Sequence, residues 1–336
     1  GRTSLVCSAL RRELTVEASP CENREEGCRR LLLVPVVELR IETAEDELRR
    51  VSIPHIHALR VWNRLSFNAV AAGAKRSGGG LRCLDRLTCK GLQMHPDDVS
   101  FLLAPSLVAT QHLKLLNLQN NRIGDDTVQR LCDSGVLGKV ETLNLRFNMV
   151  GSRGAEALAA CPTAARLRWI NLKMNAVGDE GALALSALLR RSRCMQLLNL
   201  RRQTPALTDR AALGLAEALR ASPSLQQLRL RRNRISDAGA TALALAASER
   251  LARAAAVDRE VRLELDLEEN RVREEGAVAL LRTANAAPAH ARVELLLHGN
   301  PVTREQLRAV ATVSDEQLDA SDMRLMFDTK PESELF

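Results

Sequence analysis

The stretch LKLLNLQNNRI at residues 113–123 decides the fold, because the chain carries the same pattern seven times. The pattern recurs as VETLNLRFNMV (140–150), LRWINLKMNAV (167–177), MQLLNLRRQTP (195–205), LQQLRLRRNRI (225–235), RLELDLEENRV (262–272) and RVELLLHGNPV (292–302). Each copy has two Leu or Ile residues (Leu in most copies) two positions apart, and six of the seven copies have Asn three positions later. A unit that recurs in this way cannot bury its apolar face alone, so neighbouring units must stack.

The spacing within and between the patterns predicts one strand and one helix per unit. Leu116 and Leu118, like the equivalent pairs elsewhere, lie two positions apart and therefore share one face of a short strand. Between the patterns the Leu spacing becomes helical, as in residues 181–189 and 211–219. Helix starts are predicted at Ser152, Thr208, Ser236 and Thr303. The predicted fold is an α/β solenoid shaped as a horseshoe, with a parallel concave sheet and convex helices.

The run NAVGDEGAL, from Asn175 to Leu183, resembles the ribonuclease-inhibitor type of leucine-rich repeat. The pattern starts at 113, 140, 167, 195, 225, 262 and 292, and the first steps fit the longer leucine-rich repeats. The resemblance covers about residues 84–312 and implies the horseshoe fold. It leaves the function open, because the class includes enzyme inhibitors, innate sensors, a Ran GTPase-activating protein and actin-capping modules.

The repeats divide the chain into three predicted parts. Residues 84–312 form the solenoid, and residues 1–83 form an N-terminal cap of degenerate repeats. Residues 313–336 form an acidic C-terminal cap or tail, with seven acids and two bases. Fainter strands are predicted in the N-terminal part around Val16, Leu39 and Leu59. An insertion at 248–260 is expected to extend a helix.

Cysteine usage bears on metal chemistry and on the compartment. The eight cysteines have no paired CxxC spacing, and we interpret them as structural thiols of an intracellular, reducing compartment. The alternative, a zinc cluster of Cys83, Cys89 and His95, has a six-residue spacing that matches no common zinc finger. No cofactor and no metal site is predicted.

The ends of the chain and its hydropathy bear on localisation. No run of about 18 apolar residues occurs, so no membrane span is predicted. The first residue is Gly, and the first twelve residues hold Arg2, Arg11 and Arg12 but no acid. This start fits either the edge of an organelle-targeting region or an ordinary first strand. The predicted compartments are therefore the mitochondrial matrix and the cytoplasm.

The spacers beside the buried Leu pairs sort by charge along the stack. The middle repeats carry Arg and Lys, and the repeat that follows carries Glu264, Asp266, Glu268 and Glu269. Like charges at strand spacing repel, so either the acidic repeat or a bound partner must offset the basic residues, and we favour a partner. The predicted partner-binding residues are Arg146, Lys173, Arg201, Arg202, Arg229, Arg231, Arg232, Trp169, Asn144, Asn171 and Asn199.

Two sets of Asn have different predicted roles. Asn117, Asn144, Asn171 and Asn199 lie between the Leu anchors, where they form either an amide ladder or individually satisfied groups. The Asn that ends each pattern should turn inward and hydrogen-bond the backbone of adjacent turns. This second, structural set is Asn121, Asn148, Asn175, Asn233, Asn270 and Asn300. Gln203 replaces Asn in one repeat, and two extra residues follow it, so that turn should bulge.

These features predict a non-enzymatic interaction scaffold, a subunit of a larger assembly. The sequence shows no nucleophile–base pair, phosphate loop or metal cluster, and no small-molecule substrate is predicted. Net charge is +7, which favours other protein subunits with acidic surfaces or a ribonucleoprotein such as an organellar ribosome, with direct RNA contact left open. The alternatives are an axonemal or cytoskeletal complex, and a small-GTPase regulator like the Ran-activating protein.

Overall fold

The computed structural model describes residues 84–92, 112–257, 260–288 and 291–302, together with the backbone of four short strands nearer the N-terminus. The chain divides into two compact units, residues 1–149 (unit 1) and 150–336 (unit 2). The predicted boundaries at 83/84 and 312/313 stay predictions, and residues 303–336 lie outside the described residues.

Unit 1 is a sheet of short strands in chain order. The first strand is antiparallel to the second, and the others follow in parallel. The strands are β1 (Leu5–Val6), β2 (Thr15–Glu17), β3 (Glu38–Ile41), β4 (Ala58–Val61), β5 (Arg86–Cys89), β6 (Leu115–Asn117) and β7 (Thr142–Asn144). Helix α5 (Asp125–Asp133) and the 3-10 helix η2 (Val136–Gly138) connect β6 to β7. The strands predicted around Val16, Leu39 and Leu59 are confirmed, and these three residues are aligned in register.

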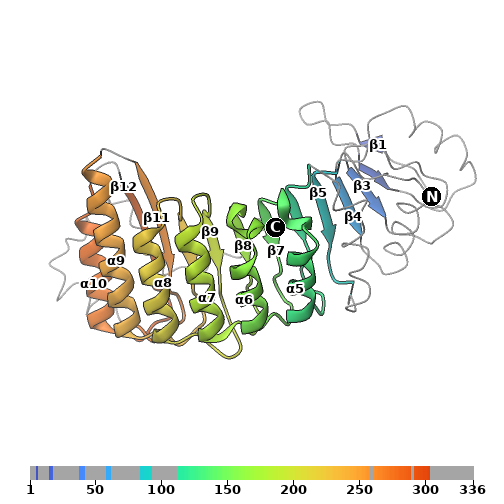
Figure 1. Cartoon of the computed structure of the whole chain (residues 1–336). Coiled ribbons are helices and arrows are strands. Elements are labelled where there is room, and N and C mark those ends of the chain that lie inside the picture. The colour runs from blue at the N-terminus through green and yellow to red at the C-terminus, as the bar shows by residue number, and fades with distance from the viewer. Residues whose placement is uncertain are drawn as a thin grey trace, which may run out of the picture. The chain divides into compact units, whose positions relative to one another are not determined.

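Unit 2 alternates helices with parallel strands. The strands are β8 (Trp169–Asn171), β9 (Leu197–Asn199), β10 (Gln227–Arg229), β11 (Val261–Asp266) and β12 (Ala291–Leu296). The helices are α6 (Ser152–Ala160), the 3-10 helix η3 (Thr163–Arg166), α7 (Gly178–Arg191), α8 (Asp209–Ala221), α9 (Asp237–Ala255) and α10 (Glu274–Asn285). Helices α6 to α10 stand side by side along one side of the strands (Figure 1). The predicted leucine-rich-repeat α/β solenoid is confirmed, and α9 extends into the insertion as far as Ala255.

The core lies between the sheet and the helices. Ile170, Leu198, Leu228 and Leu265 occupy equivalent positions in neighbouring strands and are at most 1% exposed. Small residues on the helices allow close packing, and Gly239 is the sharpest case. A Cβ there would lie 2.6 Å from Oδ1 of Asp209 and 2.8 Å from Cβ of Ala212, so any larger residue would push α9 away from α8.

The structural Asn residues turn inward as predicted. Asn233 is 7% exposed and donates to the carbonyls of Leu200 (3.0 Å) and Leu230 (2.8 Å), while its Oδ1 accepts the Leu207 amide (3.0 Å). Asn121, Asn148, Asn175, Asn270 and Asn300 make equivalent bonds. Gln203 takes over this role with its longer side chain, bonding the Leu172 carbonyl (2.9 Å) and the Val177 amide (3.1 Å). One inward amide per repeat therefore ties each turn to its neighbours.

Carboxylates link the helix starts of neighbouring repeats. Oδ1 of Asp209 accepts the backbone N–H groups of Ser236 (2.7 Å) and Gly239 (3.1 Å), and Asp237 does the same for the start of α10. Thr208 and Ser236 are the N-caps of α8 and α9, as predicted. Helix α6 begins at Ser152 itself, so its N-cap is the preceding residue, Gly151, and Thr303 lies outside the described residues.

The described cysteines are free thiols. Cys89 and Cys161 are buried, and Cys132 and Cys194 are half-buried. Burial raises the pKa of Cys89 far above its ordinary range, so this thiol stays protonated. Cys83 and His95 of the alternative zinc cluster lie outside the described residues. Within the described ranges, no group of three or more His, Cys, Asp or Glu could hold a metal ion. No helix in that part of the chain is long and apolar enough to cross a membrane.

Replacing Asn233 with Ala should lower the free energy of unfolding by about 2–3 kcal/mol, because several buried backbone groups lose their partner together. Urea denaturation of the full chain measures the change. Asn285→Ala, at the exposed end of α10, is the control and should change stability by less than about 0.5 kcal/mol. Equal effects of the two substitutions would contradict the bracing role of Asn233.

Candidate functional site

The candidate site is the side of the unit 2 sheet that faces away from the helices. We call the outward side chains of β8 to β11, with the turns that follow these strands, the sheet face. Side chains alternate along a strand, so Trp169 and Asn171 face outward because Ile170 between them is buried in the core. The described residues place no helix over this face (Figure 1).

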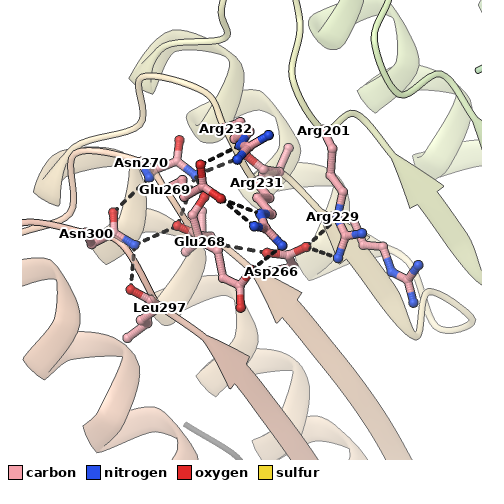
Figure 2. A network of polar contacts seen from close by, with 12 residues as sticks. Arg201, Arg229, Arg231, Arg232, Asp266, Glu268, Glu269, Asn270, Leu297 and Asn300 are labelled. Atoms are coloured by element: carbon pink, nitrogen blue, oxygen red, sulfur yellow. Dashed lines mark hydrogen bonds and ion pairs between the residues drawn. The ribbon is translucent and has the colours of Figure 1, made fainter. Parts of the chain in front are cut away.

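Arginines of the β10 turn are bound to acids of the β11 turn. Arg231 Nη1 lies 2.8 Å from Glu268 Oε2, and Arg231 Nε donates to Glu269 Oε1 at 2.9 Å. Arg232 donates to the other oxygen of Glu269. Figure 2 shows both guanidinium groups directed at this one carboxylate.

Two further ion pairs join the strands themselves. Arg229 on β10 donates to Glu264 on β11, with 3.0 Å between Nε and Oε1. Arg201 follows β9 and reaches past β10 to Asp266 on β11, with 2.6 Å between Nε and Oδ2. The side chain of Asp266 is 0% exposed and that of Arg201 is 15% exposed, so this pair is shielded from water. We call these four arginines and four acids the ion-pair network.

The pKa values of Glu268 and Glu269 move in opposite directions. Burial, and then the charge of Asp266, raise the pKa of Glu268 above its ordinary value although Arg231 and Arg201 oppose the shift. Burial also raises the pKa of Glu269, but hydrogen bonds from Arg232 and Arg231 outweigh it, so the net pKa lies below the ordinary value. The ionised form is therefore disfavoured at Glu268 and favoured at Glu269.

The ion-pair network shows what offsets the positive charge of its four arginines. From the sequence we favoured a bound partner, but the acids of the next repeat neutralise Arg201, Arg229, Arg231 and Arg232 within the chain. The correction follows from side-chain length, since Arg spans the distance between adjacent strands, and Arg201 spans two. Repulsion among these arginines is no longer an argument for a partner.

The outward Asn column does not form an amide ladder through unit 2. Asn171 Oδ1 accepts the backbone N–H of Lys173 (3.1 Å), and Asn199 Oδ1 accepts that of Arg201 (3.1 Å). Asp266 makes the same bond to Glu268 at 3.2 Å. The alternative of individually satisfied groups is therefore confirmed for these residues. Asn199 is 4% exposed, which leaves little of its side chain for a partner.

Two predicted partner-binding residues belong to unit 1. Asn144 is 1% exposed, accepts the Arg146 amide (3.0 Å) and donates to Gln119 Oε1 (3.4 Å). The Arg146 guanidinium carbon lies 5.1 Å from the centre of the Phe147 ring, a cation–π distance. Asn144, Arg146 and Phe147 thus form a local cluster within unit 1.

The remaining predicted residues lie on the β8 and β9 side of the sheet face. Trp169 is half-buried, and its indole N–H donates to Gln196 Oε1 at 3.1 Å. Lys173 is half-buried in the turn after β8. Arg202 is exposed in the turn after β9, and no acid of the described residues forms an ion pair with it. Three predicted residues, Trp169, Lys173 and Arg202, thus lie outside the ion-pair network.

The turns after β6 to β12 share a feature that we did not predict from the sequence. One residue per repeat adopts a left-handed backbone, including Met174 (φ 57°), Arg202 (φ 53°) and Arg232 (φ 59°). Residues other than Gly and Asn rarely adopt this conformation. Gly299 and Asn120 occupy the equivalent positions in their repeats. These two residue types could have indicated the left-handed conformation from the sequence.

Comparison with known proteins supports the repeat assignment. The family model described as Leucine Rich repeat matches residues 110–132, 139–159, 167–186 and 221–244. These four segments of the chain are therefore similar to leucine-rich repeats. No curated protein matches the chain. The matching family model describes a repeat and not a catalytic domain.

Solved structures resemble the chain at low identity. An internalin, InlF, from Listeria monocytogenes is 14% identical with a TM-score of 0.44, covering 82% of this chain and 77% of that one. A Bacteroides fragilis protein is 13% identical with a TM-score of 0.44, covering 80% and 76%. The yeast Rad7 and Elc1 complex matches at 14% identity with a TM-score of 0.37, covering 83% and 81%. No functional conclusion follows from matches this distant.

Substituting Asp266 with Asn should lower the free energy of unfolding by about 2–3 kcal/mol, since it leaves the shielded Arg201 charge without its carboxylate. Arg232→Gln removes a pair whose guanidinium is about half exposed and should cost less than about 1 kcal/mol. Chemical denaturation of both variants tests this order. A larger loss for Arg232→Gln would contradict the burial argument.

Glu268→Gln and Glu269→Gln should change stability in opposite directions at neutral pH. A raised folded-state pKa means that stability is lost as pH rises through it, so Glu268→Gln should stabilise at neutral pH. A lowered pKa means that stability is lost as pH falls through it, so Glu269→Gln should destabilise at neutral pH. Both differences should shrink as pH falls below the carboxyl range. Denaturation curves across this range measure them, and a shared sign at neutral pH would refute the assignment.

Proposed function

We propose that this chain is a non-catalytic protein-interaction scaffold, a subunit of a larger assembly, which binds a partner protein through the β8 and β9 side of the sheet face. The observation that carries the proposal is Trp169, a half-buried aromatic side chain held in one orientation on an open sheet. Binding hot spots are enriched in Trp and Arg.

The backbone around Trp169 is fixed. The amides of Gln196 (2.7 Å) and Leu197 (3.0 Å) both donate to the Arg168 carbonyl, and Trp169 is in register with Leu197 on β9. The Trp169–Gln196 hydrogen bond spans the same two strands. A side chain that is already ordered loses little conformational entropy on binding, which supports its use as an anchor.

The charge of Arg202, in the turn that follows β9, supports a partner with acidic groups. Arg202 is exposed and does not belong to the ion-pair network. Arg binds carboxylates bidentately. A partner that inserts an apolar side chain beside Trp169 and presents a carboxylate to Arg202 fits this surface.

More specifically, we propose that the protein is a subunit of a ribonucleoprotein. Its repeats would be of the ribonuclease-inhibitor-like type. The net charge of +7 and the predominance of Arg favour an assembly rich in phosphate or acidic protein. The compartment proposed is the mitochondrial matrix or the cytoplasm, both of which keep thiols reduced. Direct RNA contact is a separate proposal, and a salt titration of RNA affinity tests it.

Trp169→Ala in the full chain should weaken partner binding about thirtyfold, the effect of losing a hot-spot aromatic. Co-purification of the tagged protein from its own cells identifies the partner, and titration with that partner gives the affinity. Leu245→Ala is the matched control, because Leu245 is a large apolar side chain that is 55% exposed on helix α9. If Trp169→Ala binds normally and Leu245→Ala does not, the binding surface lies on the helices and the proposal fails.

A further inference from the structure

A second charged surface lies where the strands of unit 2 turn into helices. Arg234 follows the structural Asn of the β10 turn, and Arg271 follows that of the β11 turn, with Arg273 two residues further on. All three side chains are exposed, and none forms an ion pair with an acid of the described residues. We call Arg234, Arg271 and Arg273 the loop-edge arginines.

The backbone of each loop-edge arginine is fixed by the repeat before it. Arg234 donates its amide to the Leu207 carbonyl and Arg271 donates to the Ile235 carbonyl, both at 2.8 Å. The Arg273 amide donates to Asp237 Oδ1 at 2.7 Å. Since the Arg271 amide donates to the residue after Arg234, the two arginines occupy equivalent positions of adjacent repeats, whose strands are about 4.8 Å apart.

The acids nearest to this edge have other partners. Asp209 and Asp237 accept backbone N–H groups at the helix starts, and Glu269 holds Arg231 and Arg232. Glu274 and Glu275 occupy the first turn of α10, where they face the positive end of the helix dipole. In the described residues neither forms an ion pair with a loop-edge arginine.

We propose that the loop-edge arginines bind an acidic helix of a partner protein, whose Glu or Asp side chains four residues apart face Arg234 and Arg271. Side chains at i and i+4 of a helix are about 5–6 Å apart, which matches the repeat spacing. Same-face residues of an extended peptide are about 6.6 Å apart and fit less well. This contact is separate from the Trp169 surface and does not depend on it.

A protein ligand fits this edge better than single-stranded nucleic acid. Such nucleic acids are held by aromatic side chains on which the bases stack. In the described part of unit 2 Trp169 alone among Phe, Tyr and Trp is present, and it lies on β8 rather than in the β10 and β11 turns. Carboxylate recognition by Arg already operates beside this edge, at Glu269.

Binding of two fluorescent helical peptides to the full chain at low ionic strength tests the proposal. The peptides have equal charge, with Glu at i, i+4 spacing in one and at i, i+2 spacing in the other. The first should bind more tightly, and Arg234→Gln/Arg271→Gln should weaken its binding roughly tenfold, as expected for two exposed charge pairs. Arg190→Gln/Arg193→Gln is the control, because it removes the same charge at the opposite end of the helix layer, where α7 leads into β9.

Three outcomes would overturn the proposal. The first is that the i, i+4 peptide does not bind, and the second is that both double variants weaken its binding equally. The third is that single-stranded RNA of equal charge displaces the peptide with the same dependence on Arg234 and Arg271. The thermal unfolding midpoint should be unchanged in both double variants, because these side chains are exposed. Trp169→Ala should bind the peptide normally, so the failure of this proposal and the failure of the Trp169 surface can be told apart.

Discussion

One buried amide in each repeat satisfies the backbone of the turn that follows the strand. Asn233 shows the principle, because it bonds a carbonyl of its own turn together with a carbonyl and an amide of the preceding repeat. Without such a group these buried polar atoms would be left unpaired, at a cost of about 1–3 kcal/mol each. The inward amide therefore holds the turns in register, and the outward positions are free to vary.

Fixed register explains the charge pattern of the sheet face. When neighbouring turns are held at strand spacing, arginines of β9 and β10 lie within reach of carboxylates of β11. Arg201 is the clearest example, since it passes over β10 to reach Asp266. The four arginines and four acids of the ion-pair network are therefore balanced within the chain. We assign partner recognition to groups outside the ion-pair network. These are Trp169 on the sheet face and Arg234 and Arg271 at the loop edge.

The sequence predicts the repeat architecture well because the signal is periodic and local. The Leu spacing specifies the strands, and the final Asn has the same role in each of the six repeats that carry it. The partners of long side chains are not local. Arg201 and Asp266 are 65 residues apart, and the pattern indicates which column each occupies but not how far the Arg extends. The left-handed turn position was hidden because Met174 and Arg202 occupy it in place of Gly.

The central claim is that acids of the β11 repeat, and not a partner, neutralise the four arginines of the ion-pair network. A double-mutant cycle on the isolated full chain, with Arg201→Met, Asp266→Asn and the two combined, tests it most directly. We predict a coupling free energy of about 2 kcal/mol in the absence of any partner, since the pair is shielded from water. Additive losses, within about 0.5 kcal/mol, would show that Arg201 and Asp266 do not interact and would contradict the account.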